Sequence, residues 1–142
     1  MRTVLLCLFC LPFVSACSLV GDDDRQLVDL GIETEEEYRD ERARMIGALE
    51  DAIGEARAAD VSSCAVVNVG TKACGGPAEF RVYSTTDGDT DRILELAEEI
   101  TDLDAEANME FGLVSTCDVP VAPRPVLAEG RCAAEGFRTS AR

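Results

Sequence analysis

The sequence predicts a small α+β domain in which two amphipathic helices pack on a three-stranded antiparallel sheet, in the order α-β-β-α-β, with disulfide bonds as staples. Three observations lead to this prediction. Two long segments repeat apolar residues every three or four positions, three short segments have the pattern of strands, and four of the seven cysteines lie beyond the first twenty residues.

The first helix is predicted to begin after Thr34. Thr34 and Glu37 have the spacing of a capping box, in which each side chain satisfies the other residue's backbone amide. The acids at positions 35–37 also complement the positive end of the helix dipole. We expect the helix to end near Ala59 and Asp60. Its apolar stripe consists of Tyr38, Met45, Ile46, Leu49, Ile53 and Ala56.

Two strands are predicted to follow. Residues 62–69 form a run rich in β-branched residues, and residues 70–72 are expected to be the turn after it. The Cys-Gly-Gly-Pro segment at 74–77 is a sharp breaker, and residues 79–84 then alternate in polarity as a second strand does.

The second helix is predicted to open within residues 87–91, with Asp89 or Thr90 as its N-cap, and Gly112 suits its C-terminal end. After a loop with three prolines, residues 126–133 are expected to form the third strand or a hairpin. The stripe of the second helix consists of Ile93, Leu96, Ala97, Ile100, Leu103, Ala107 and Phe111.

The N-terminus has the pattern of an export signal. Arg2 precedes an almost wholly apolar run at positions 4–14, as in secretory signal peptides. The end of this run, Val-Ser-Ala-Cys at 14–17, resembles the lipobox of bacterial lipoproteins. The resemblance implies that the Cys17 thiol is acylated and that the chain is cleaved before it. The sequence also fits ordinary cleavage after Ala16, whereas Pro12 and the acids that follow disfavour a retained membrane span.

The chain is therefore divided into residues 1–16, the signal peptide; 17–32, a lipidated N-terminus with a flexible acidic tether; 33–135, one α+β domain; and 136–142, a C-terminal tail. An acyl anchor on Cys17 would hold the protein to membrane lipid. By resemblance to bacterial sorting rules, Ser18 after the lipidated cysteine favours the outer membrane, facing the periplasm.

Four cysteines, Cys64, Cys74, Cys117 and Cys132, remain for two disulfides in an oxidising compartment. Three connectivities are open. We favour the nested one, Cys64 with Cys132 and Cys74 with Cys117, because a third strand lying antiparallel beside the first would bring Cys64 and Cys132 face to face. A zinc or redox role is the alternative, but the cysteines lack the short paired spacing of zinc knuckles.

The segments around these cysteines resemble a group of small exported bacterial proteins with a Cys-Gly-Gly-Pro motif. The resemblance rests on residues 64–77, on Val-Tyr-Ser at 82–84, and on the surroundings of Cys117 and Cys132. It implies a disulfide-held exported domain and brings no reaction with it. Where an aromatic residue tends to follow the proline in that group, this chain has Ala78.

Composition excludes several classes of function. The chain has 13 Lys and Arg against 28 Asp and Glu, and its formal charge of −15 disfavours nucleic acid and anionic membrane surfaces. It has no histidine, so Ser-His and Cys-His nucleophile pairs and imidazole-based zinc sites are impossible. We expect no catalytic residues, no metal ligands and no cofactor.

Acidic residues supply two alternatives to this expectation. Asp87, Asp89, Asp91 and Glu98 have the spacing of part of a calcium loop, although Arg92 stands where that loop needs glycine. A pair of carboxylates could also serve a small hydrolase. The expected function remains a non-catalytic binding or envelope-interaction module, with a basic protein or peptide as the partner that its charge would attract.

Overall fold

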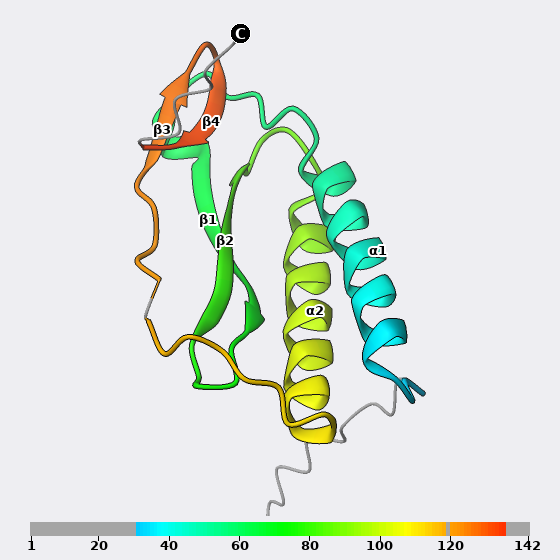
Figure 1. The fold of residues 1–142 in the computed structure, drawn as a ribbon. Helices are drawn as coiled ribbons and strands as arrows, with labels where there is room; N and C mark the ends of the chain where they lie inside the picture. The colour runs from blue at the N-terminus through cyan, green and yellow to red at the C-terminus, as the bar shows by residue number, and fades with distance from the viewer. Residues whose placement is uncertain (1–30, 119, 136–142) are drawn as a thin grey trace, which may run out of the picture.

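The computed structural model describes residues 31–118 and 120–135. The signal peptide, Cys17, the tether as far as residue 30 and the C-terminal tail lie outside these described residues. In Figure 1, two helices lie side by side next to a long two-stranded hairpin, and a second hairpin lies near one end of the first. The elements are α1 (Glu35–Ile53), the 3-10 helix η1 (Val61–Ser63), β1 (Cys64–Thr71), β2 (Pro77–Ser84), α2 (Thr90–Glu110), β3 (Pro125–Ala128) and β4 (Arg131–Ala134).

Helix α1 begins as predicted but ends earlier. The capping box of Thr34 and Glu37 is formed in both directions, and Gly54 caps the helix at its C-terminus. The expected end near Ala59 is wrong, because Ala56 has a left-handed backbone with φ of 50° and cannot continue the helix. Ala56 is nevertheless buried, so it contributes to the core from the segment after α1.

Helix α2 follows the prediction closely. The Asp89 carboxylate accepts a hydrogen bond from the Arg92 amide at 3.1 Å, which confirms Asp89 as the N-cap. The helix ends at Glu110, and Phe111 and Gly112 follow at its C-terminal end. Its predicted stripe is buried from Ile93 to Ala107 and forms the largest part of the core.

Strands β1 and β2 form one antiparallel hairpin, and the predicted turn is displaced. The strand continues through Gly70 and Thr71, and the turn spans residues 72–76, where the Lys72 amide donates to the Gly76 carbonyl at 2.9 Å. Alternation along the pleat directs Val67 and Val69 into the core with the helices.

The three-stranded sheet is wrong: the described residues form two separate two-stranded sheets, β1 with β2 and β3 with β4. Residues 126–133 therefore adopt the hairpin alternative, and the order gains two elements, the short helix η1 and the strand β4. The turn consists of Glu129 and Gly130, whose φ values of 52° and 74° are those of a tight two-residue hairpin turn.

Backbone pairing explains why β4 does not join β1. The amide of Cys132 donates to the carbonyl of Ala56 at 2.8 Å. The amide of Ala58 donates to the carbonyl of Gly130 at 3.0 Å. The edge of β4 is thus occupied by the segment that follows α1. Because side chains alternate along a strand, Cys64 lies on the opposite face of β1 from Val67, and Cys132 bonds to it there.

Candidate functional site

The four cysteines of the described domain are joined in two disulfides. Cys64 bonds to Cys132 and Cys74 bonds to Cys117, each with a Cα–Cα distance of 5.4 Å, and this is the nested pairing. The first bridge ties the β3–β4 hairpin to the start of β1. The second ties the β1–β2 turn to the segment after α2. Because all four sulfurs are bonded in pairs, these cysteines act as staples in this structure.

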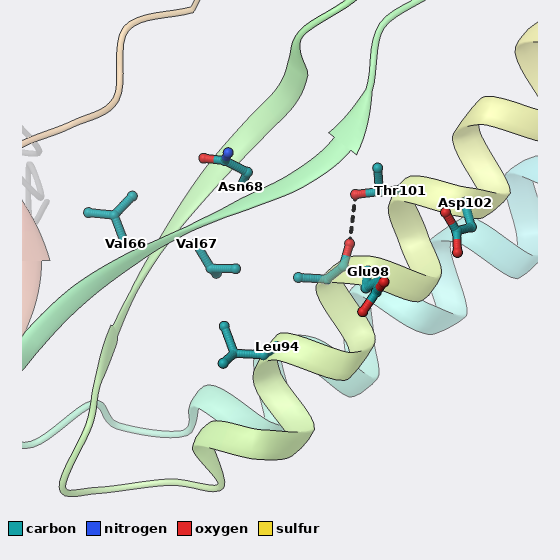
Figure 2. Close-up of a pocket in the computed structure, with 8 residues that line it drawn as sticks. Val66, Val67, Asn68, Leu94, Glu98, Thr101 and Asp102 are labelled. Atoms are coloured by element: carbon teal, nitrogen blue, oxygen red, sulfur yellow. Dashed lines mark hydrogen bonds between the residues drawn. The ribbon is translucent and has the colours of Figure 1, made fainter. Parts of the chain in front are cut away.

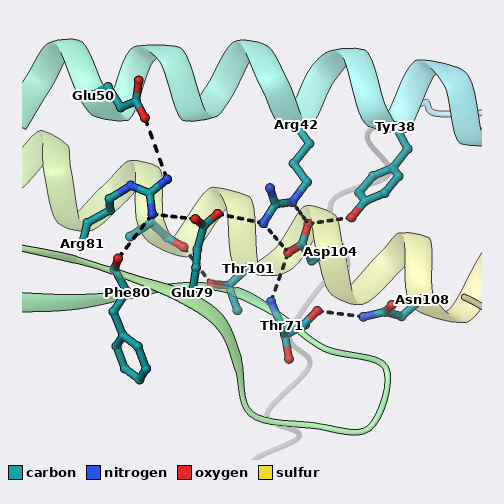
Figure 3. A network of polar contacts seen from close by, with 11 residues as sticks. Tyr38, Arg42, Glu50, Thr71, Glu79, Phe80, Arg81, Thr101, Asp104 and Asn108 are labelled. Carbon is teal, nitrogen blue, oxygen red and sulfur yellow. Dashed lines mark hydrogen bonds and ion pairs between the residues drawn. The ribbon is translucent and has the colours of Figure 1, made fainter. Parts of the chain in front are cut away.

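The polar centre of the domain is Asp104, which was not among the site residues expected from the sequence. Its side chain lies on α2 with only 2% exposure. The hydroxyl of Tyr38 and Nε of Arg42 donate to Oδ1 at 3.0 and 2.8 Å, and the Thr71 amide donates to Oδ2 at 3.1 Å (Figure 3). One carboxylate therefore holds α1, α2 and the end of β1 together.

A chain of ion pairs extends this centre along β2. Arg42 Nη2 lies 3.3 Å from Oε1 of Glu79, and Glu79 contacts Arg81 Nη1 at 2.5 Å. Arg81 in turn lies 3.8 Å from Glu50 on α1 (Figure 3). Glu79 and Arg81 of β2 therefore meet α1 through charged contacts, whereas Val67 and Val69 of β1 lie in the apolar core.

Tyr38 is held in this cluster by its hydrogen bond to Asp104. Partial burial, together with the charge of Asp104 and the hydrogen bond to it, raises the pKa of the Tyr38 phenol to about 12. The Tyr38 phenol therefore ionises at higher pH than an ordinary tyrosine. Asp104 has its oxygens occupied by Tyr38, Arg42 and Thr71, so we assign the cluster to packing of the fold.

A sequence signal for Asp104 existed. Residues 100, 103, 104 and 107 fall on one side of a helix, so Asp104 interrupts an otherwise apolar stripe. Tyr38 and Arg42 are spaced as i and i+4 on α1 and project from one face. A charged residue within a buried stripe predicts a cation nearby, but only the fold reveals which one.

The residues of the calcium alternative are used elsewhere. Asp87 Oδ2 accepts from the Arg57 amide at 2.7 Å, and Asp89 caps α2. Asp91 and Glu98 lie within α2 itself. Over residues 31–118 and 120–135, no group of three or more Cys, Asp or Glu side chains is arranged to hold a metal ion.

Most cations in the described domain are paired with acids. Since the chain has 28 acids against 13 cations, many carboxylates are left facing solvent without a cationic partner. Glu98 and Asp102 on α2 are examples, both exposed. The cations in ion pairs are Arg39, Arg42, Arg44, Arg57, Lys72, Arg81, Arg92 and Arg131.

The surface has two sizeable grooves beside the β1–β2 hairpin. One, of about 410 Å³, lies between β1 and α2, and Figure 2 shows Val67, Leu94 and Glu98 around it. The other, of about 850 Å³, lies between β2, the end of α1 and the β3–β4 hairpin. The first has unpaired acids on one rim, whereas the second contains Arg81 and Arg131 in ion pairs with glutamates.

No protein-family model, no curated protein and no solved structure matches the chain. Among the residues that the structure describes, no helix is both long enough and apolar enough to cross a membrane.

Proposed function

We propose that this chain is a bacterial lipoprotein whose Cys17 carries the membrane anchor and whose domain is a non-catalytic module that binds a basic protein or peptide at the cell envelope. The lipobox-like segment at 14–17 supports the anchor. Ser18 favours the outer membrane, on its periplasmic side.

The charge arrangement of the domain carries the binding proposal. Most cations of the described domain lie in ion pairs with neighbouring acids, so the domain displays its excess of acids as unpaired carboxylates on the surface. Such a surface attracts a basic partner and accelerates its encounter. The same surface repels nucleic acid and anionic headgroups.

The polar cluster at Asp104 supports a binding role rather than a reaction centre. Glu79 and Asp104 share Arg42, which is an arrangement of two carboxylates that a hydrolase could use. Asp104 is 2% exposed and already bonded, so a substrate has no access to it.

Intact mass of the protein purified from membranes of an expressing bacterium tests the anchor. We expect a chain that starts at Cys17 and carries a diacylglyceryl group and a further acyl chain. Four alkylatable thiols should be present only after reduction. The Cys17→Ala variant is the control and should lack the lipid mass. A chain that starts at Met1, or at Cys17 without lipid, would contradict the anchor.

Binding to basic and acidic polymers tests the module. The purified protein should bind poly-L-lysine at low salt and release it as ionic strength rises, because salt screens contacts between exposed charges. Poly-L-glutamate of the same length is the control and should not bind. Absent binding, or binding that salt does not weaken, would contradict a basic partner.

A further inference from the structure

We propose that the groove between β1 and α2 is the docking site for an extended segment of the basic partner, which adds to the free edge of β1 as a further strand and carries Lys or Arg at alternate positions. This inference rests on the proposed function and assigns a place and a conformation to the bound partner.

The groove follows a strand edge. Val66, Val67 and Asn68 line it as three consecutive residues, although side chains alternate between the two faces of a strand. A groove that contacts three consecutive residues must therefore run along the edge of β1, between the two faces of the strand. Figure 2 shows these residues on β1, with Leu94 and Glu98 projecting from α2 on the other side of the groove.

The edge of β1 at this groove is free. In the described part of the chain β1 pairs with β2 alone, along one side of the strand. The β3–β4 hairpin, which was expected to cover that edge, instead pairs with residues 56–58. A free edge presents backbone amides and carbonyls in a row, and an added strand satisfies them.

The charge of the rim selects the partner. Glu98 and Asp102 line the groove, and among the described residues neither has an ion-pair partner. They are one helical turn apart, which is about 6 Å along the axis. Alternate side chains of a strand are separated by about 6.6 Å, so successive cations on one face of a bound strand match successive acids on the helix.

Leu94 would give an apolar contact to the face of the bound strand that is turned toward α2. Its side chain is 45% exposed at the groove. The methylene stem of a Lys or Arg can cover Leu94 while the charged end reaches Glu98. On the opposite face of the added strand, apolar residues would lie beside Val66. A second copy of this chain is a poor occupant, because two chains with a charge of −15 repel each other.

The test measures binding of a ten-residue peptide of alternating Lys and Val, with both termini blocked, to the purified full-length protein by calorimetry. Glu98→Gln with Asp102→Asn removes the acidic rim. The matched control is Glu36→Gln with Asp40→Asn, an exposed pair of acids at the same spacing on α1. We expect about tenfold weaker binding for the groove variant and less than twofold for the control.

Two further measurements test the geometry. In an extended strand of alternating Lys and Val, the valine amides point to one edge and the lysine amides to the other, so two peptides are compared, one N-methylated at the valines and one at the lysines. The peptide that lacks the amides facing β1 should bind far more weakly than the unmodified peptide. In amide NMR spectra, the unmodified peptide should shift Val66, Val67 and Asn68 most, with smaller changes on the outward face of α1. Together these results would support strand addition at β1.

The outcomes separate this inference from the proposed function. Equal weakening by both charge variants, or undiminished binding of both N-methylated peptides, would overturn docking at β1 and leave a basic partner in place. Failure of both the peptide and poly-L-lysine to bind at low salt would overturn both proposals. A dimer in light scattering that the groove variant alters would assign the groove to a second copy and overturn the inference.

Discussion

A Cβ atom on Gly70 would lie 2.1 Å from Oδ2 of Asp104, a separation that atoms do not adopt. The backbone at Gly70 approaches the carboxylate this closely because the next amide, that of Thr71, donates to the same oxygen. Gly70 also has φ of 68°, a left-handed conformation that favours glycine. The close contact between β1 and α2 thus requires a residue without a side chain.

Gly70→Ala should therefore destabilise the domain, by about 3 kcal/mol or more, because the strained backbone and the displaced carboxylate both cost free energy. Gly47→Ala is the matched control. Gly47 lies inside α1, and a Cβ atom there would meet nothing within 4 Å, so this change should stabilise the helix by about 0.5–1 kcal/mol. Urea unfolding measures both, and equal effects would contradict the steric account.

Asp104→Asn should cost about 3 kcal/mol of unfolding free energy, because it leaves the Arg42 cation without its buried carboxylate. The cost lies at the low end of the range for buried pairs, since the Arg42 side chain is 24% exposed and partly solvated. Asp102→Asn on the same helix is the control, and we expect a change within about 0.5 kcal/mol. Chemical denaturation measures the unfolding free energy of both variants. A large loss for Asp104→Asn alone would show that the buried contacts of Asp104, and not the removal of a negative charge in general, stabilise the fold.

Alkaline titration should reveal the raised pKa of the Tyr38 phenol. The chain has two tyrosines, so the Tyr83→Phe variant isolates the ultraviolet absorbance change of Tyr38 on ionisation. We expect its pKa at about 12 in the folded protein, against 10.0 for an ordinary tyrosine. The Tyr38 phenol ionises at lower pH in the unfolded chain than in the folded protein. Its protonated form therefore contributes fully to stability below pH 10, and this contribution declines from there to about pH 12. Rapid mixing limits the time at alkaline pH and keeps the disulfides intact. A pKa of about 10 for Tyr38 would contradict its burial and its hydrogen bond to Asp104.

The two disulfides should differ in their rate of reduction. Their sequence separations of 68 and 43 residues give similar stabilisation, about 4 kcal/mol each, when loop closure entropy is considered alone. Cys74 and Cys117 are both exposed, whereas Cys132 is buried at 9%. Limited reduction followed by alkylation and peptide mass analysis should label Cys74 and Cys117 first. Labelling of Cys132 first would show that access of the reductant does not control the order in which the two disulfides are reduced.

Local sequence was sufficient for several elements. The capping box at Thr34 and the Asp89 cap depend on contacts within four residues, and both are formed. The stripe of α2 followed from helical spacing. The end of α1 could not be predicted in this way, because a buried Ala56 continues the apolar spacing while its backbone leaves the helix.

The sequence by itself determined the acidic charge, the two helices, the β1–β2 strands and the supply of four cysteines for two bridges, because these depend on composition and on neighbours along the chain. Only the tertiary structure decided that β4 pairs with residues 56–58, that Asp104 is the partner of Arg42, and that β1 keeps a free edge beside α2. These outcomes depend on which distant segments meet, and many pairings satisfy the same local pattern.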